Sequence, residues 1–71
     1  MSDVKDMPTN GAFLARYRNE NDTLIADTYG WQDGKLKKFC FDAGKVTWKD
    51  VSDGAVHELR SNPDVIYTPH S

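Results

Sequence analysis

The chain has 71 residues, of which 38% are hydrophobic, 11% aromatic and 28% charged, and its formal net charge at pH 7 is −2. A chain of this length forms one small domain, and its apolar content is too high for a disordered tail. The balanced charge argues against a non-specific nucleic-acid binder, whose affinity comes mainly from neutralising phosphates, and against an acidic mimic of nucleic acid.

The cysteine content and the hydropathy of the chain indicate the cellular compartment in which the protein is expected. Cys40 is the single cysteine, so no internal disulfide can form, which is typical of a reducing compartment. The first six residues carry charge and precede no apolar run, and no stretch is long enough to cross a membrane. We therefore expect a cytoplasmic protein without a disulfide framework.

Residues 1–11 are polar and contain Pro8, Asn10 and Gly11, so they predict a flexible N-terminal arm ahead of a single small β domain over residues 12–69. Deletion of residues 2–10 is then expected to leave the fold intact. The first strand is predicted over residues 12–18 (AFLARYR), where Phe13 and Ala15 alternate with arginines.

Residues 19–22 (NEND) predict a turn, and residues 23–31 (TLIADTYGW) predict a second strand because β-branched and aromatic side chains are frequent there. Gly30 indicates a bulge or a close backbone approach within this strand. The dipeptide Asp33-Gly34 then predicts a tight hairpin turn, since Asp followed by Gly suits a turn with positive φ at both central residues.

A third strand is predicted over residues 35–41 (KLKKFCF), but Leu36 is out of phase with Phe39 and Phe41, which suggests a bulge near Lys37 and Lys38. After a turn at residues 42–44, residues 45–51 (KVTWKDV) predict a fourth strand. The net charge varies along the chain, and the segment that contains these hairpins is the positive one. Residues 1–30 carry a net charge of −2, residues 31–50 a net charge of +2 and residues 51–71 a net charge of −2.

Ser52 and Asp53 can cap a short helical turn near residues 53–60, which Gly54 keeps from being long, and residues 65–68 (VIYT) predict a last strand that ends at Pro69. The fold expected is mainly β: a small five-stranded antiparallel meander that curls into a partly open barrel, like the Src-homology-3 or oligonucleotide-binding barrels. The alternative is an open antiparallel sheet carrying a short helix. The expected core consists of Phe13, Leu24, Phe39, Phe41, Val46, Trp48 and Ile66.

Candidate catalytic and metal-binding residues are few. Cys40, His57 and an aspartate contain the elements of a nucleophile, a base and an orienting group, but no spacing selects them. His57 and His70 lie far apart in sequence and there is no second cysteine, which is not the pattern of a zinc site. We expect a protein that is not an enzyme and that uses no cofactor or metal.

The segment KKFCF, residues 37–41, resembles the basic-aromatic strand of cold-shock and RNA-recognition domains, in which Phe side chains stack on bases and lysines meet phosphates. It lacks the glycines that flank the first Phe of those motifs. A small domain also needs its aromatic residues for its own core. Nucleic-acid binding is therefore the alternative function, with the candidate residues Trp31, Lys35, Lys37, Lys38, Lys45 and Lys49.

By elimination, the expected function is the binding of another protein, for which Tyr, Trp and Arg often supply the main energetic contacts. In size and charge the chain resembles small regulators and phage-encoded inhibitors that occlude a host enzyme such as RNA polymerase or a nuclease. Contact residues are expected on the arm, on the first strand and among the unassigned aromatics: Val4, Met7, Arg16, Arg18, Tyr29 and Trp31.

Overall fold

A computed structural model describes residues 3–70 and contains one five-stranded antiparallel sheet and one helix. Along the chain the elements are β1 (Ala12–Arg18), β2 (Leu24–Gln32), β3 (Lys35–Asp42), β4 (Lys45–Asp50), α1 (Asp53–Ser61) and β5 (Ile66–Pro69). All five predicted strands are present, with bounds that differ from the prediction by a residue or two. No helix among the described residues is long and apolar enough to cross a membrane.

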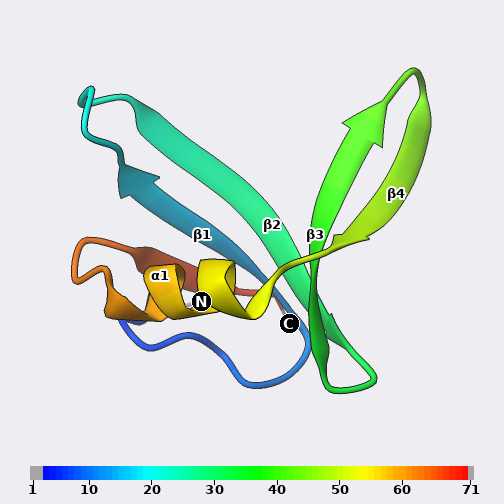
Figure 1. Ribbon diagram of the computed structural model, residues 1–71, viewed down its shortest axis with the longest axis horizontal. Coiled ribbons are helices and arrows are strands. Elements are labelled where there is room, and N and C mark those ends of the chain that lie inside the picture. The colour runs from blue at the N-terminus through cyan, green and yellow to red at the C-terminus, as the bar shows by residue number, and fades with distance from the viewer. Residues whose placement is uncertain (1–2, 71) are drawn as a thin grey trace.

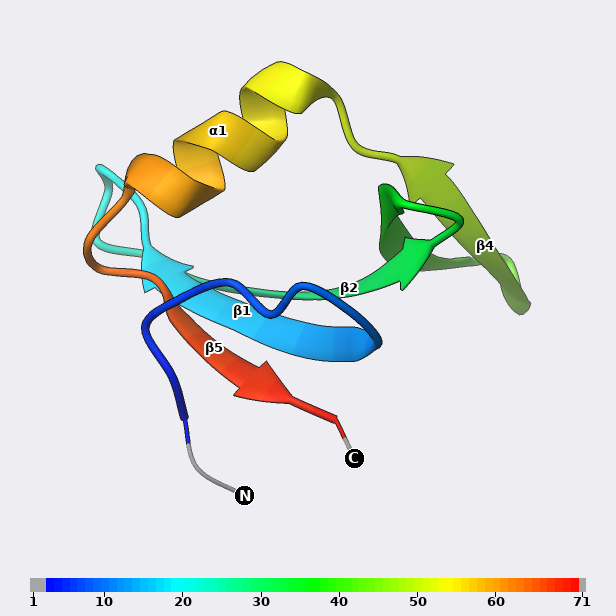
Figure 2. The ribbon, with the colours of Figure 1, turned by 90° about the horizontal axis from the view of Figure 1, so that it is seen from below.

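The sheet is open, with the strand order β4-β3-β2-β1-β5. Strands β1 to β4 form a meander, and α1 then crosses one face of the sheet and leads the chain to β5 beside β1 (Figure 2). A barrel would need β5 to pair with β4, whereas these two strands form opposite edges. The expected barrel is therefore wrong, and the alternative, an open sheet with a short helix, is correct.

Both hairpins that flank β3 close through tight turns with positive φ at the two central residues. The φ angles are 53° at Asp33 and 79° at Gly34, and 51° at Ala43 and 78° at Gly44. Such turns match the right-handed twist of antiparallel strands. The turn predicted at Asp33-Gly34 is confirmed, and the second turn adopts the same conformation.

Helix α1 begins where the sequence predicts a cap. The Ser52 side chain accepts a hydrogen bond from the Ala55 backbone N–H at 3.2 Å, and Asp53 lies in the first turn, where its charge suits the helix dipole. The helix has 9 residues and ends at Ser61. Its bounds agree with the predicted range of residues 53–60 to within one residue, although 9 residues form more than the one brief turn expected.

The core lies between α1 and the face of the sheet that the helix covers. Phe13 is fully buried, and its ring centroid lies 5.7 Å from that of Tyr29 and 5.6 Å from that of Tyr67. Contacts between aromatic rings at this spacing add to the stabilisation from apolar burial. The buried residues are Met7, Phe13, Ala15, Tyr29, Leu36, Leu59, Val65 and Tyr67.

Of the expected core residues only Phe13 is buried. The other six are exposed and have relative accessibilities of 37% to 66%: Leu24, Phe39, Phe41, Val46, Trp48 and Ile66. The strand register explains the error. Phe13 pairs with Tyr29, and two residues further along β2 Trp31 pairs with Leu36, so the covered face continues through these residues. The six exposed side chains belong to the opposite face, which no segment among residues 3–70 covers.

The expected bulge in β3 is absent. Pairing with β2 runs without interruption from Gln32↔Lys35 to Tyr29↔Lys38, and pairing with β4 from Lys37↔Asp50 to Asp42↔Lys45. Beyond Lys38, β3 pairs with β4 alone, and the outer hairpin diverges from β2 (Figure 1). Leu36 is out of phase because the first half of β3 contributes to the core while the second half has its apolar side chains on the open face.

The described part of the arm packs against the β5 side of the domain. Val4 and Tyr67 exchange two backbone hydrogen bonds of 2.8 Å, and Met7 is only 9% exposed. The Pro8 carbonyl accepts a hydrogen bond of 2.8 Å from the Trp31 indole N–H. Residues of the arm therefore contribute both to the core and to the sheet edge.

Candidate protein-interaction surface

Four large apolar side chains gather on the open face of the β3–β4 hairpin. They are Phe39, Phe41, Val46 and Trp48, with relative accessibilities of 37%, 66%, 53% and 38%. The rings of Phe39 and Trp48 meet edge to face, with centroids 5.4 Å apart and an interplanar angle of 75°. We call these four residues the hairpin patch.

The register of the hairpin builds this patch. Phe39 pairs with Trp48 and Phe41 with Val46, so each pair projects from the same side of the two strands. Gly30 of β2 makes room for the indole, because a Cβ atom at this position would lie 3.2 Å from Trp48 Cζ3. The close backbone approach predicted at Gly30 is thus a contact with the patch.

Two of the three charged residues on the patch side of the hairpin neutralise each other. Lys37 donates a hydrogen bond to Asp50 on the same side of the hairpin. This hydrogen bond and the charge of Lys37 lower the pKa of the Asp50 carboxyl below its usual value, so the carboxylate is charged at neutral pH. Lys37 and Asp50 therefore add no net charge at the base of the patch, and Lys35 is the remaining cation of the hairpin on that side.

The six residues expected to bind nucleic acid do not form one surface. Lys38 and Lys49 are paired across the strands on the side opposite to Lys37, and Lys38 Nζ lies 3.8 Å from an Asp27 carboxylate oxygen. Lys45 shares that side, because it is four residues from Lys49 in β4, and Lys35 shares the side of Lys37. The lysines are thus divided between two faces.

Trp31, the aromatic residue of that set, is half-buried at the margin of the core. Its indole N–H bonds to the arm, and the Arg60 guanidinium carbon lies 5.9 Å from its ring centroid. One face of the ring is therefore occupied by a side chain of the same domain. Stacking of a base on that face would displace a cation–π contact.

The residues expected to bind a protein are also dispersed. Met7 and Tyr29 are 9% and 6% exposed and serve the core, and burial raises the pKa of the Tyr29 hydroxyl to about 12. Val4 is exposed at the edge bridge beside β5. Only Arg16 and Arg18 share one hollow of the surface.

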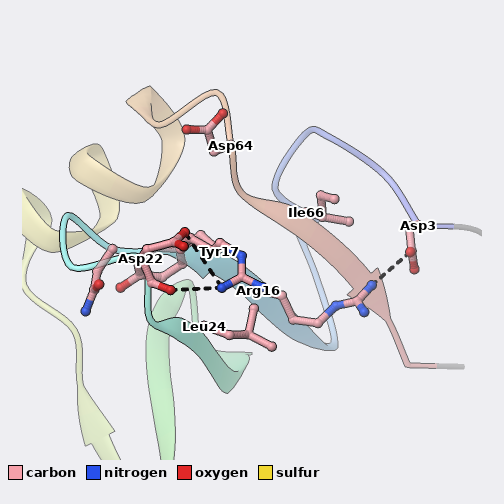
Figure 3. A pocket seen from close by; sticks show the side chains of 9 residues that line it. Asp3, Arg16, Tyr17, Asp22, Leu24, Asp64 and Ile66 are labelled. Carbon is pink, nitrogen blue, oxygen red and sulfur yellow. Dashed lines mark hydrogen bonds and ion pairs between the residues drawn. The ribbon is translucent and has the colours of Figure 1, made fainter.

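This hollow, of about 730 Å³, lies at the end of β1 and is drawn in Figure 3. Arg16 Nη2 donates to Asp3 at 2.8 Å and to Thr68 at 3.3 Å, while Arg18 donates to the Asp22 carbonyl at 2.9 Å. The hydrogen bond that Asp3 accepts from Thr68, together with the charge of Arg16, lowers the pKa of the Asp3 carboxyl. Both arginines are engaged within the chain, so the hollow offers little free charge to a ligand.

The sequence does not identify the hairpin patch as a candidate site, because its pattern places all four of these residues in the expected core. The sequence did contain a signal. Leu36 and Phe39 cannot share a face of a regular strand, so one of them must point away from the core. The sequence does not say which one.

The described residues show no cluster of side chains that could hold a metal ion. Among residues 3–70, no three His, Cys, Asp or Glu side chains lie close enough to hold a metal ion. His57 Nε2 lies 3.4 Å from Ser61 Oγ on the same helix. Comparisons of the chain with protein-family models, with curated proteins and with solved structures find no match.

Proposed function

We propose that this chain is a small, non-enzymatic regulatory protein that binds another protein through the hairpin patch. The observation that supports this proposal is the exposure of Phe39, Phe41, Val46 and Trp48 together on a hairpin that diverges from the sheet. Apolar side chains gathered on a surface mark interaction sites, and Phe and Trp are enriched at the centres of protein interfaces.

The charge around the patch favours a protein over a nucleic acid. A nucleic acid needs free cations next to its stacking aromatics, so that phosphates are neutralised while bases stack. Here Lys37 is hydrogen-bonded to Asp50, and Lys38, Lys45 and Lys49 belong to the other side of the hairpin. Lys35 is the one lysine of the hairpin that lies on the patch side without an ion pair among residues 3–70. An apolar centre with a polar border of mixed charge is the arrangement found in protein interfaces.

The partner class that we propose is a larger enzyme, such as RNA polymerase or a nuclease, inhibited in the manner of phage-encoded regulators. Small size, mixed charge and an exposed apolar hairpin suit a protein that covers part of a larger surface. The activity of the captured partner, measured with and without the added protein, tests this part of the proposal. If the activity of the partner is unchanged when the partner is saturated with this protein, the protein binds the partner but does not regulate it.

Affinity capture with two matched variants tests the binding surface. The tagged protein and the variants Phe41→Ser and Leu24→Ser are incubated with nuclease-treated lysate of the cells that produce the protein. Phe41 and Leu24 are 66% and 57% exposed, so both variants should fold, but only Phe41 belongs to the patch. Recovery of a partner should be lost with Phe41→Ser and kept with Leu24→Ser. Equal recovery with both variants would place the contact elsewhere.

Nucleic-acid binding remains the second candidate, because three aromatic side chains are exposed on one sheet face: Phe39, Phe41 and Trp48. We expect weak, salt-sensitive binding, since few lysines are free to neutralise phosphates. Fluorescence anisotropy with labelled single-stranded and duplex oligonucleotides measures this affinity. Submicromolar binding at physiological salt that is lost in the double variant Lys37→Glu and Lys38→Glu would make this candidate the preferred function.

A further inference from the structure

We propose that the outer edge of β4 binds an extended segment of the partner protein by strand addition, and that this segment carries acidic residues on one side and apolar residues on the other. This inference rests on the proposed function, because it assumes that the partner is a protein. It adds a backbone contact and a sequence pattern that the hairpin patch alone does not specify.

The hydrogen-bonding groups of β4 are divided between its two edges. The Val51 backbone N–H donates to the Leu36 carbonyl at 3.1 Å, so the odd-numbered residues of this segment bond to β3. Bonding alternates along an antiparallel strand, so the N–H and C=O groups of Val46 and Trp48 point away from β3. Among residues 3–70 no other backbone segment bonds to these groups, and all six residues of β4 are exposed.

The opposite edge of the sheet is covered. Val4 exchanges both backbone hydrogen bonds with Tyr67, Asp3 accepts a hydrogen bond of 2.7 Å from the Thr68 hydroxyl, and Pro69 has no N–H to offer. Proteins commonly protect their edge strands in such ways. At β4 no segment among the described residues does so, and the edge is available for an added strand.

The side chains on the two faces of β4 determine which residues the added strand of the partner should carry. Val46 and Trp48 project to the hairpin patch, whereas Lys45 and Lys49 project to the other side and make no ion pair within residues 3–70. Among the paired residues of β3 and β4, Asp42 is the one carboxylate on the side of Lys45 and Lys49. A strand with acidic residues opposite the two lysines and apolar residues opposite Val46 and Trp48 would complement both faces.

A second copy of this chain fits the edge less well. If two β4 strands paired antiparallel around Thr47 with their patches on the same side, Lys45 of each copy would lie opposite Lys49 of the other. Like charges directly opposite each other destabilise a strand pair. The lysines therefore disfavour the dimer in this register and favour an acidic segment.

A labelled peptide tests the inference directly. Its central residues are Glu opposite Lys45 and Lys49, Val opposite Val46 and Trp48, and Thr between the two valines. A second peptide carries Lys in place of both Glu residues, and a third has N-methyl groups on the two valines, which lie at hydrogen-bonding positions. Anisotropy titration of the full chain should give saturable binding of the first peptide, weaker binding of the second and loss of binding of the third.

The variant Lys45→Glu with Lys49→Glu supplies the matched control. It should bind the acidic peptide about fivefold more weakly, since two favourable cross-strand pairs become repulsive, and it should now prefer the lysine peptide. Unchanged preference, retained binding of the N-methylated peptide, no binding of any peptide, or dimerisation through β4 in sedimentation experiments would each overturn strand addition. The proposed function is tested separately, because partner capture that is lost with Phe41→Ser would still support it.

Discussion

Phe13 and Trp48 are both large aromatic residues of strands, but they differ in burial. Phe13 is 0% exposed and Trp48 is 38% exposed. Phe13→Ala should lower the free energy of unfolding by about 3–5 kcal/mol, the range for a buried aromatic, which is enough to unfold a marginal domain. Trp48→Ala should cost less than about 2 kcal/mol, because much of its ring already contacts water. Urea denaturation compares the two, and equal losses would contradict the assigned core.

Tyr29 should make the stability sensitive to alkaline pH. Burial raises the pKa of its hydroxyl from 10.0 to about 12, and the charge of Asp27 contributes in the same direction. Because the folded-state pKa is higher than the unfolded one, the contribution to stability is complete below pH 10 and is lost as pH rises towards about 12. The pKa of the Tyr67 hydroxyl is also raised by burial, so it acts in the same sense.

The comparison of wild type with Tyr29→Phe isolates this contribution. Urea midpoints measured at increasing pH should fall more steeply for the wild type above pH 10, because the variant has no phenol to ionise. The two proteins share every other titratable group. Parallel pH profiles would show that Tyr29 ionises as easily in the folded state as in the unfolded chain.

At the scale of elements, the arm contributes to the fold more than its composition suggests. Val4 continues the sheet beside β5, Met7 enters the core and Pro8 bonds to Trp31. Deletion of residues 2–10 should therefore destabilise the domain, in contrast to the expectation from sequence. Met7→Ala should lower the free energy of unfolding by about 2 kcal/mol. The exposed neighbour Lys5 supplies the control, since Lys5→Ala should have little effect on the free energy of unfolding. If deletion of residues 2–10 leaves the melting temperature unchanged, the arm is dispensable for the fold.

The outer hairpin should be the least protected part of the sheet. Beyond Lys38, β3 pairs with β4 alone, and no residue of β4 is buried. Regions with few buried apolar contacts open at low free energy. In hydrogen exchange, the β4 amides bonded to β3, such as Thr47, should exchange faster than the amides shared by β1 and β2. Slower exchange at Thr47 than at Ala15 would contradict this order.

The covered face of the sheet carries the core, and the open face carries the proposed binding surface. The double variant Phe41→Ser and Val46→Ser changes only exposed side chains, so its free energy of unfolding should stay within about 1 kcal/mol of the wild type. The same variant should lose the partner. Thermal melting and affinity capture on one preparation measure both properties. A large fall in the melting temperature would mean that the patch belongs to the core.

Local features of this protein could be predicted from its sequence. The strands, the turn at Asp33-Gly34 and the cap at Ser52 depend on interactions between residues close in the chain, such as the positive φ that Gly34 adopts readily. Alternation also predicts correctly that Phe39 and Phe41 share a face, because side chains in a strand alternate with a period of two. Of the candidate sites, the sequence identified the hairpin but not the role of its aromatics.

The tertiary structure decided which face is buried. Alternation shows which side chains of a strand share a face, but it does not show which face is buried. Helix α1 crosses the face that contains Phe13, and that face is therefore the core (Figure 2). The same crossing places β5 beside β1 instead of β4, which leaves the sheet open and, among residues 3–70, the outer edge of β4 unpaired. Both outcomes depend on contacts between residues far apart in the chain, and the period of a single strand contains no information about them.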